Sequence, residues 1–359
     1  MMKVIRTVNV AVVGATGAVG TMMLRVLEER RFPVGELTAL ASRRSRGRRV
    51  RFGGRSVRVR ELTRDAFDGV DLALFSAGAG CSLAFAPEAA RRGALVVDNS
   101  SAFRLEPGVP LVVPEVNPEA ASRHRGIIAN PNCSTIIMVV ALEPLHRAAG
   151  LRRVVVSTYQ SVSGAGARAI QQLWRESGRL AGRWRAYAPG RGVEQACEKL
   201  RAAGASGGPL PHRIACNVIP QIDVMRPDGY TKEEFKMRAE SRKIMGLPSL
   251  RLSATCVRVP VYLAHSEAVT AEFARPITPA RARAILRRSP GVVVMDEPGE
   301  GRYPMPINLG GRDAVGVGRI RQDPDDPRIL HFWAVGDNVR KGAATNAVQI
   351  AELLVGASA

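Results

Sequence analysis

Cys133 has the setting in this sequence that is most favourable for chemistry. It follows the turn Asn130-Pro131-Asn132 and precedes an apolar helical pattern that runs from 134 to about 150. Pro131 has no N–H and favours an extended residue before it, so a strand or loop should end there. At the start of a helix, unpaired N–H groups and the helix dipole favour a thiolate. A reactive thiol and one more buried cysteine both remain open interpretations.

A nucleophilic thiol needs an acid or base with a pKa near neutrality, for which histidine is the natural residue. His265 follows a predicted strand and lies in a polar turn, although a structural or surface histidine would also fit there. The five cysteines and five histidines are scattered, without C-x-x-C or H-E-x-x-H spacing. Neither a disulfide framework nor a metal site is therefore expected.

A second chemical signal lies near the N-terminus. An apolar strand at 8–13 leads into the glycine turn 14–20, and a helical pattern continues to 29. Strand, glycine turn and helix open a dinucleotide-binding unit, where backbone N–H groups and the helix N-terminus hold a pyrophosphate. The spacing is G-x-x-G-x-x-G instead of G-x-G-x-x-G, so the prediction depends on the structural context more than on the motif.

The end of the next predicted strand, 36–41, indicates which dinucleotide binds. An NAD enzyme places an Asp or Glu there, about 20 residues beyond the glycines, to bind the ribose 2′-hydroxyl. Here residues 42–46 read Ser-Arg-Arg-Ser-Arg. Because arginine matches phosphate geometry, this loop predicts NADP, although part of it also fits a basic surface loop. Residues 48–60, with Gly53-Gly54, predict an exposed hairpin.

Strands and helices alternate through the first 130 residues, as a doubly wound parallel sheet requires. Polar residues at 99–104 follow a predicted strand, at the sheet edge where such folds bind ligands. The other segments of this region are strands at 70–76 and 94–98, a helix at 82–92, and short stretches at 111–114 and 126–129 that lead to the Cys133 turn.

After Gly150 the pattern changes to long β-rich runs with fewer crossover helices, which predicts a second, α+β domain with a mixed or antiparallel sheet. Little beyond a loop with some helix is predicted for 178–212. The predicted strands are 152–160, 214–219, 251–260, 267–274, 314–321 and 329–335. The predicted helices begin near 168 and span 231–245, 279–288 and, with a clear amphipathic pattern, 341–354.

Composition limits the class of protein. A chain of 359 residues suggests two domains, and no apolar run approaches the roughly 18 residues of a membrane span. The start lacks the design of a signal peptide, so the cytoplasm is expected. The net charge of +20 fits anionic partners, but the arginines are spread along the chain without a nucleic-acid-binding motif. Nucleic-acid and membrane binding are therefore not expected.

A nicotinamide cofactor and an activated thiol together define a reaction class. The thiolate adds to an aldehyde or an acyl phosphate, and the covalent thiohemiacetal or thioester exchanges a hydride with the cofactor. Six segments along nearly the whole chain resemble the bacterial aspartate-β-semialdehyde dehydrogenase family. They are 12–20 (VVGATGAVG), 113–117 (VPEVN), 130–135 (NPNCST), 157–166 (STYQSVSGAG), 254–261 (ATCVRVPV) and 337–338 (DN).

This resemblance implies a role for each candidate catalytic residue. Cys133 would be the nucleophile, and Asn132 would help to hold the acyl oxygen. His265 would be the acid/base that takes the proton as the thiol attacks. Gln160 would orient the substrate, and Arg258 would clamp the substrate α-carboxylate as a bidentate partner.

Further binding roles come from the same resemblance. Glu233 would bind the substrate amino group, and Lys236, together with Arg104, would bind the phosphate. Glu233 and Lys236 lie one helical turn apart, so without the resemblance they would fit a solvated salt bridge. The cofactor residues predicted from the glycine turn, the basic loop and the resemblance are Gly14, Thr16, Gly17, Ala18, Val19, Ser42, Arg44, Ser45, Ser163, Gly164 and Asn338.

The implied reaction is the reversible reduction of L-aspartyl-4-phosphate by NADPH to aspartate semialdehyde and phosphate. In the family this step supplies lysine, threonine, methionine, isoleucine and diaminopimelate synthesis. The resemblance also implies a homodimer, possibly a tetramer. Residues 1–132 with 336–359 would form a Rossmann-like NADP-binding domain, and 133–335 would form a catalytic and dimerisation domain of α+β class.

Two features depart from the family pattern, and two rival functions remain to be considered. Several arginines between 43 and 49 crowd the cofactor loop, so the one that holds the 2′-phosphate is open, and 178–212 matches the family poorly. An N-acetyl-glutamyl phosphate reductase would share the chemistry, but its substrate has no ammonium group for Glu233. A non-catalytic scaffold relative would be marked by loss of the thiol, and Cys133 is present.

Overall fold

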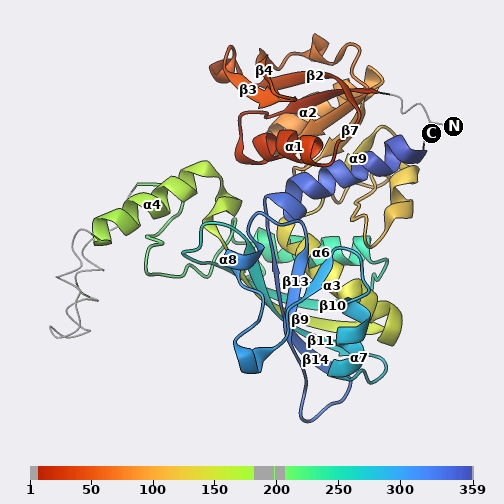
Figure 1. Ribbon diagram of the computed structural model, residues 1–359, viewed down its shortest axis with the longest axis vertical. Coiled ribbons are helices and arrows are strands. Elements are labelled where there is room, and N and C mark those ends of the chain that lie inside the picture. The colour runs from red at the N-terminus through yellow and green to blue at the C-terminus, as the bar shows by residue number, and fades with distance from the viewer. Residues whose placement is uncertain (1–6, 182–197, 199–206, 358–359) are drawn as a thin grey trace.

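The computed structural model describes residues 7–181, 198 and 207–357 of the chain. Two sheets, each with covering helices, lie one above the other in Figure 1, and α9 (Thr345–Ala357) runs between them. Among the described residues, no helix is long and apolar enough to cross a membrane. The chain thus forms two layered units with one helix at their junction.

The first sheet has six parallel strands in the order β5-β2-β1-β6-β7-β8, which confirms the predicted doubly wound sheet. Helices cover both faces, so strands such as β1 are apolar and buried apart from Asn9 near its start. Helices α1 and α9 pack on one face, and α2 packs on the other. The bounds are β1 Val8–Val13, α1 Ala18–Glu29, β2 Val34–Ala41, β5 Arg60–Glu61, β6 Leu72–Phe75, α2 Ala79–Arg91, β7 Leu95–Asp98 and β8 Ile127–Ala129.

The second sheet is mixed, with the order β10-β9-β11-β14-β13-β12, and it also agrees with the prediction. Its two outer pairs are parallel and its three inner pairs are antiparallel. Helices α3, α6 and α7 cover one face and share a core with it. The bounds are α3 Cys133–Ala149, β9 Leu151–Gln160, α4 Ala167–Ala181, α6 Lys232–Ile244, β10 Arg251–Arg258, β11 His265–Phe273, α7 Pro279–Leu286, β12 Val292–Val294, β13 Val315–Gln322 and β14 Ile329–Gly336.

The predicted basic hairpin is present as β3 (Arg49–Phe52) and β4 (Arg55–Arg58). Its two-residue turn is Gly53-Gly54, with φ of +58° and +70°. Positive φ at both central positions suits the twist of a hairpin, and glycine adopts it without steric cost. The hairpin therefore follows from local sequence alone.

The prediction of a strand at 214–219 was wrong. Only Ile219 forms a bridge, with Arg258, while Ile214 and Ala215 are buried in a small cluster under α4. Their apolar side chains fill a core without joining a sheet, which a short apolar run cannot reveal. Most of the poorly matched segment 178–212, namely 182–197 and 199–206, lies outside the described residues.

The C-terminal helix begins later than predicted. A π-helical turn, Arg340–Ala344, comes first, with i→i−5 hydrogen bonds such as Gly342 N–H to the Asp337 carbonyl at 2.9 Å. Helix α9 follows, and its first residues are buried on all sides because it lies between the two sheets. The amphipathic pattern therefore describes only the later part of the helix.

Arg340 joins the two units. Its guanidinium group binds Asp313, at 2.8 and 3.1 Å, and Glu29 of α1 at 2.5 Å. The next residue, Lys341, is buried and donates to Glu115 at 2.5 Å. These ion pairs hold the π-helical turn against both sheets.

Candidate active site

A polar cavity of about 260 Å³ lies where the two units meet. The edge of the first sheet, the start of α3, the end of β9 and helix α6 all contribute to it. All five predicted substrate-binding residues and part of the predicted cofactor set line it. These residues are Val19, Arg104, Asn132, Cys133, Gln160, Ser163, Gly164, Glu233, Lys236, Arg258 and Asn338.

Cys133 is the first residue of α3, as predicted. Asn132 is the N-cap, and its side-chain oxygen accepts from the N–H groups of Ser134 and Thr135 at 3.0 and 3.1 Å. This is the usual way to satisfy the first N–H groups of a helix. The π-helical turn covers the other side, because a Cβ on Gly342 would lie only 2.8 Å from the Cys133 Cβ.

The helix start does not by itself make Cys133 a thiolate in the free enzyme. Burial and the nearby Glu233 carboxylate raise the pKa of the Cys133 thiol to about 12, and together they outweigh the opposing charges of Arg104 and Arg258. The start of α3 stabilises a thiolate less than expected, because the Asn132 side chain already accepts hydrogen bonds from two of its N–H groups. Cys133 is therefore a neutral thiol at pH 7 until substrate or a base changes its surroundings.

Alkylation should report this pKa directly. The thiolate is the reactive form, so the rate of Cys133 carbamidomethylation by iodoacetamide should rise about tenfold per pH unit from pH 7 to 10, without a plateau. Mass spectrometry of the Cys133 peptide would separate it from the exposed Cys216, which serves as the internal reference. A plateau below pH 8 would contradict the raised pKa.

Glu233 is the centre of the substrate side of the cavity. One carboxylate oxygen accepts from the Asn132 and Gln160 side-chain amides at 2.8 and 3.2 Å, and the other lies 3.3 Å from the Lys236 ammonium group. Lys236 also binds Asp223 at 2.8 Å. The alternative of a solvated salt bridge was wrong, because Glu233 is only 4% exposed. Helix α6 directs the Glu233 and Lys236 side chains into the cavity.

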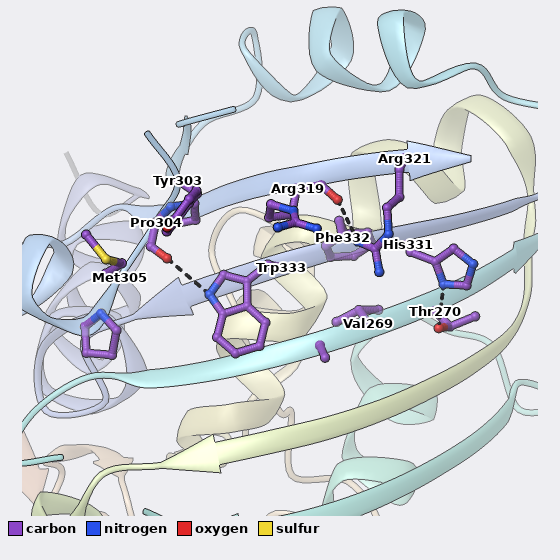
Figure 2. Close-up of a pocket in the computed structure, with 12 residues that line it drawn as sticks. Val269, Thr270, Tyr303, Pro304, Met305, Arg319, Arg321, His331, Phe332 and Trp333 are labelled. Carbon is purple, nitrogen blue, oxygen red and sulfur yellow. Dashed lines mark hydrogen bonds between the residues drawn. The ribbon is translucent and has the colours of Figure 1, made fainter. Parts of the chain in front are cut away.

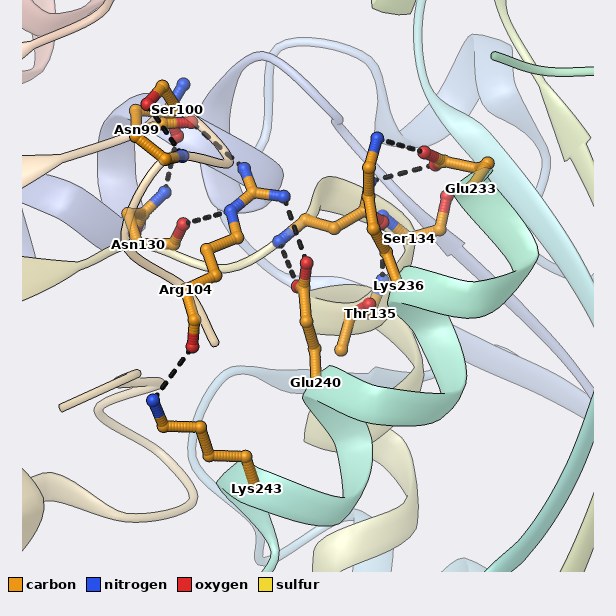
Figure 3. Close-up of polar contacts among 12 residues, drawn as sticks. Asn99, Ser100, Arg104, Asn130, Ser134, Thr135, Glu233, Lys236, Glu240 and Lys243 are labelled. Atoms are coloured by element: carbon orange, nitrogen blue, oxygen red, sulfur yellow. Dashed lines mark hydrogen bonds and ion pairs between the residues drawn. The ribbon is translucent and has the colours of Figure 1, made fainter. Parts of the chain in front are cut away.

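Arg104 is fixed in the cavity by three groups (Figure 3). It donates to the main-chain oxygens of Asn130 and Asn99, both at 2.9 Å, and to the Glu240 carboxylate at 3.1 Å. Glu240 also accepts from the Asn132 N–H at 2.7 Å, so it supports the residue that caps α3. Burial raises the pKa of Glu240, which Arg104 opposes. Sequence reasoning missed Glu240, since its position two turns along α6 gave no signal.

Loss of Glu240 should destabilise the fold. Glu240→Ala leaves the buried Arg104 guanidinium group with two main-chain oxygens but without its carboxylate partner, which costs about 3–5 kcal/mol of the free energy of unfolding. Urea unfolding of both proteins would measure this difference. Glu119→Ala, at an exposed carboxylate, is the matched control and should change the free energy by less than about 0.5 kcal/mol. Equal stability of the two variants would contradict the structural role.

His265 lies behind the cavity wall and is fully buried. Its Nδ1 is 3.1 Å from both the N–H nitrogen and the hydroxyl oxygen of Ser161, and its Nε2 has no hydrogen-bond partner among the described residues. A Cβ on Gly164 would lie 3.2 Å from this Nε2 and 3.0 Å from Arg258 Nη1. Because Gly164 lines the cavity, Nε2 of His265 lies directly next to the cavity lining.

Ser163 and Asn338 form one hydrogen-bonded group beside Gly164. The Asn338 amide nitrogen donates to the Ser163 hydroxyl at 2.9 Å, and its oxygen accepts from the Ala264 N–H at 3.1 Å. Both residues are buried and line the cavity. The structure thus brings together residues that lie far apart in the sequence, beside the proposed nucleophile.

The glycine turn fits a dinucleotide. Gly14 has φ of +86°, and a Cβ there would lie 3.0 Å from Ser76 at the end of β6. Gly17 begins α1 without a side-chain cap, and the first turn carries no acidic residue, so its N–H groups are open to a pyrophosphate. Thr16 donates to Ser45 at 3.3 Å, which ties the glycine turn to the basic loop.

Two predicted cofactor residues, Ser42 and Arg44, are exposed on the basic loop. Among the described residues, Arg43 and Arg44 have no side-chain partner, whereas Arg46 pairs with Glu61 at 3.6 Å. Arg49 likewise donates to Ser56 on the hairpin at 2.6 Å. The structure thus shows which arginines of this loop and hairpin already have a side-chain partner, and the sequence alone could not show this.

A parallel sheet with an open glycine turn, joined to a mixed sheet across a cavity that holds one cysteine, defines a two-domain nicotinamide-dependent dehydrogenase. Known proteins agree. The family model "Semialdehyde dehydrogenase, NAD binding domain" matches residues 9–124, and "Semialdehyde dehydrogenase, dimerisation domain" matches 142–341. The chain belongs to the aspartate-semialdehyde dehydrogenase family, as the resemblance predicted.

Individual relatives cover nearly the whole chain. The aspartate-semialdehyde dehydrogenase of Aquifex aeolicus is 52% identical over 350 residues, which are 97% of this chain and 98% of that protein. The Bacillus subtilis protein of the same name is 48% identical over 350 residues, again 97% and 98%. Among solved structures, aspartate semialdehyde dehydrogenase II from Vibrio cholerae, complexed with ASA, is 46% identical with a TM-score of 0.89 and covers 98% of this chain and 99% of that one.

Several residues of the cavity surroundings gave no signal in the sequence. Glu240 and Asp223 bind the substrate-side residues, and Ser161 holds His265. Glu267, two residues beyond His265, is fully buried, and burial with the Glu233 charge raises its pKa well above the usual range. Among the described residues its carboxyl oxygens have no hydrogen-bond partner. The surroundings of each of these residues are formed by segments that lie far apart in the sequence.

Proposed function

We propose that the enzyme catalyses the reversible, NADPH-dependent reduction of L-aspartyl-4-phosphate to L-aspartate 4-semialdehyde and phosphate. The observation that carries this proposal is the cavity itself. It holds a single cysteine together with the buried Arg258 and Glu233, which match the carboxylate and ammonium groups of a free amino acid. The family membership and the reaction class agree with it.

The Cys133 sulfur would attack the acyl carbon and release phosphate, which leaves a thioester on the enzyme. Arg104 and Lys236 face the cavity and would hold the phosphate group, while Gln160 orients the substrate. Asn132 uses one amide hydrogen for Glu233 and keeps a second for the acyl oxygen. His265 would act as the acid/base. The bound nicotinamide supplies the hydride that brings the thioester to the aldehyde level.

The cofactor in this proposal is NADP. Gly14, Gly17 and the N–H groups at the start of α1 would hold the pyrophosphate, together with Thr16, Ala18 and Val19. Ser42, Arg44 and Ser45 would surround the 2′-phosphate. Among the described residues Arg43 and Arg44 are both exposed without a side-chain partner, whereas Arg46 and Arg49 are engaged. Ser163, Gly164 and Asn338 would meet the nicotinamide end.

Arg44→Ala should therefore weaken NADPH specifically. Loss of one charge-assisted phosphate contact should raise the KM for NADPH roughly tenfold or more and leave the weak activity with NADH unchanged. Steady-state kinetics with both cofactors would measure this selectivity. Arg49→Ala, on the hairpin, is the matched control and should keep the wild-type KM. Equal use of NADP and NAD by the wild-type enzyme would contradict the proposal.

The decisive experiment is the reverse reaction with two substrates. The purified enzyme should reduce NADP in the presence of phosphate and aspartate semialdehyde, and it should not do so with N-acetyl-glutamate semialdehyde, which has no ammonium group for Glu233. Omission of phosphate is the control for a simple aldehyde oxidation. Turnover of the acetylated substrate alone would overturn the substrate assignment.

The outer face of the second sheet supports a homodimer. A groove of about 440 Å³ lies on this face. Figure 2 shows its lining residues, where Trp333 donates to the Pro304 carbonyl and Thr270 contacts His331. Val155 and Tyr159 are also exposed here, and a dimerisation-domain model matches this part of the chain. Sedimentation should show a dimer or tetramer, and a monomer at micromolar concentration would contradict this proposal.

Two further predictions stay with this proposal. The dinucleotide-binding domain would comprise 1–132 with 336–359, and the catalytic and dimerisation domain would comprise 133–335. A cytoplasmic location fits a step in amino-acid synthesis.

A further inference from the structure

The two ring nitrogens of His265 have different surroundings. His265 is the first residue of β11 and is fully buried. Its Nδ1 lies 3.1 Å from the Ser161 main-chain nitrogen and 3.1 Å from the Ser161 hydroxyl oxygen. Its Nε2 has no partner among the described residues. The ring is therefore bound by the protein on one side only.

The contact with the main-chain nitrogen decides where the hydrogen sits. An amide N–H can donate a hydrogen bond but cannot accept one, so Nδ1 must be the acceptor and carry a lone pair. A neutral imidazole then has its hydrogen on Nε2. The Ser161 hydroxyl can also donate to Nδ1, so it is compatible with the same tautomer. With hydrogen on Nδ1, two N–H groups would face each other.

Ser161 itself is held rigidly. It is fully buried, its carbonyl oxygen accepts from Arg258 Nη1 at 2.7 Å, and its hydroxyl lies 2.9 Å from the Ser163 hydroxyl and 3.2 Å from the Asn338 oxygen. The N–H of Ser161 therefore cannot turn away from His265 without breaking several hydrogen bonds. The hydrogen bonds that hold Ser161 therefore also fix the preferred tautomer of His265.

The ring is also neutral. Burial and the adjacent Arg258 charge hold the pKa of His265 well below its usual range. Nε2 lies beside Gly164, whose backbone lines the cavity, and a side chain there would contact Nε2 at 3.2 Å. The Nε2–H group is thus the part of the ring nearest to the cavity wall.

We propose that Ser161 is a positioning residue whose main-chain N–H holds the resting His265 in the Nε2–H tautomer, so that His265 first meets the substrate carbonyl oxygen as a hydrogen-bond donor. A donor aimed at an oxygen that gains negative charge stabilises the transition state. As the sulfur attacks, Nε2 gives its hydrogen to the substrate carbonyl oxygen and takes the thiol proton in its place, so the ring is neutral before and after the step. This inference rests on the proposed function for its role in the reaction, but the tautomer itself does not.

Neutron diffraction from crystals of the full-length enzyme, grown in deuterated buffer at pH 7, would test the tautomer. We expect deuterium on Nε2 of His265 and none on Nδ1. Deuterium on Nδ1 would overturn the proposal. This measurement does not depend on turnover, so an enzyme that is inactive with aspartate semialdehyde but carries deuterium on Nε2 would disprove the proposed reaction and leave the tautomer intact.

Two substitutions separate the N–H group from the hydroxyl. Ser161 has φ of −64°, which proline shares, and Gln160 before it is in a strand, as a residue before proline should be. Ser161→Pro removes the N–H, whereas Ser161→Ala keeps it. The ¹⁵N chemical shifts of His265 should show the Nε2–H tautomer in the wild type and in Ser161→Ala, and a mixture of tautomers in Ser161→Pro.

The kinetic constants should follow the tautomer. Compared with Ser161→Ala, Ser161→Pro should lower kcat by up to roughly tenfold, the value of one net hydrogen bond, with the KM for NADPH unchanged. The same tautomer in both variants would overturn the role of the N–H. If Ser161→Pro does not fold, the neutron map and the shifts of Ser161→Ala still decide, because hydrogen on Nδ1 in either contradicts the proposal.

Discussion

Replacement of Cys133 by alanine should abolish turnover in both directions, with a loss of kcat of about four to six orders of magnitude. The reason is that the covalent thioester cannot form without the sulfur, and among the described residues Cys133 is the one cysteine that lines the cavity. The assay is phosphate-dependent reduction of NADP by aspartate semialdehyde. Incubation of the wild-type enzyme with acyl phosphate should also give an acyl adduct on the Cys133 peptide by mass spectrometry.

The fold should survive this change. Cys133 is half-buried at a helix start, and alanine is a good helix residue, so the thermal midpoint should stay within a few degrees of the wild type. Cys81→Ala, at a half-buried cysteine in α2, is the matched control and should keep full activity. If Cys133→Ala retained even one per cent of wild-type turnover, covalent catalysis by this residue would be excluded.

His265→Asn should lower kcat by roughly 10²–10⁴-fold, the usual contribution of a positioned acid/base. The KM values for substrate and cofactor should change little, because an acid/base contributes mainly in the transition state and other residues are proposed to bind the substrate. Steady-state kinetics across pH 6–9 would measure both constants, and the part of the pH profile that belongs to His265 should disappear in the variant.

The control for this prediction is His124→Asn. His124 accepts from the Gly126 N–H at 3.1 Å in the loop before β8 and is not among the residues that line the cavity, and asparagine can accept the same bond. Its kinetic constants should match the wild type. A loss of activity in His265→Asn with a large rise in KM, or with a lowered thermal midpoint, would point to a structural role for the histidine.

Local sequence patterns were sufficient to predict most of the fold. The two-residue glycine turn specifies the basic hairpin, and Pro131 with the apolar run after it places the start of α3. Thr231 and Glu234 form a capping box that fixes the start of α6 close to the predicted residue. These signals involve neighbours in the chain, so a single sequence contains them in full.

The environment of the site could not be predicted in the same way. The state of the Cys133 thiol depends on Glu233, which is 100 positions away, and on an N-cap that competes for the helix N–H groups. Glu240 and Ser161 act through partners more than 100 residues distant. Sequence spacing predicted which residues are present, but charge and protonation depend on burial, which arises only in the folded chain.

The π-helical turn at Arg340–Ala344 limits how this part of the chain can change in length. A π-helical turn holds one residue more than the α-helical turn it replaces. Deletion of a single residue would restore the regular helix and rotate α9 by about 100°. Gly342 would leave Cys133, and Arg340 would leave Asp313 and Glu29. A substitution in this segment changes one contact and leaves the others in place. A change of length would break the contacts of Arg340 between the two units and the contact of Gly342 with Cys133 at the same time.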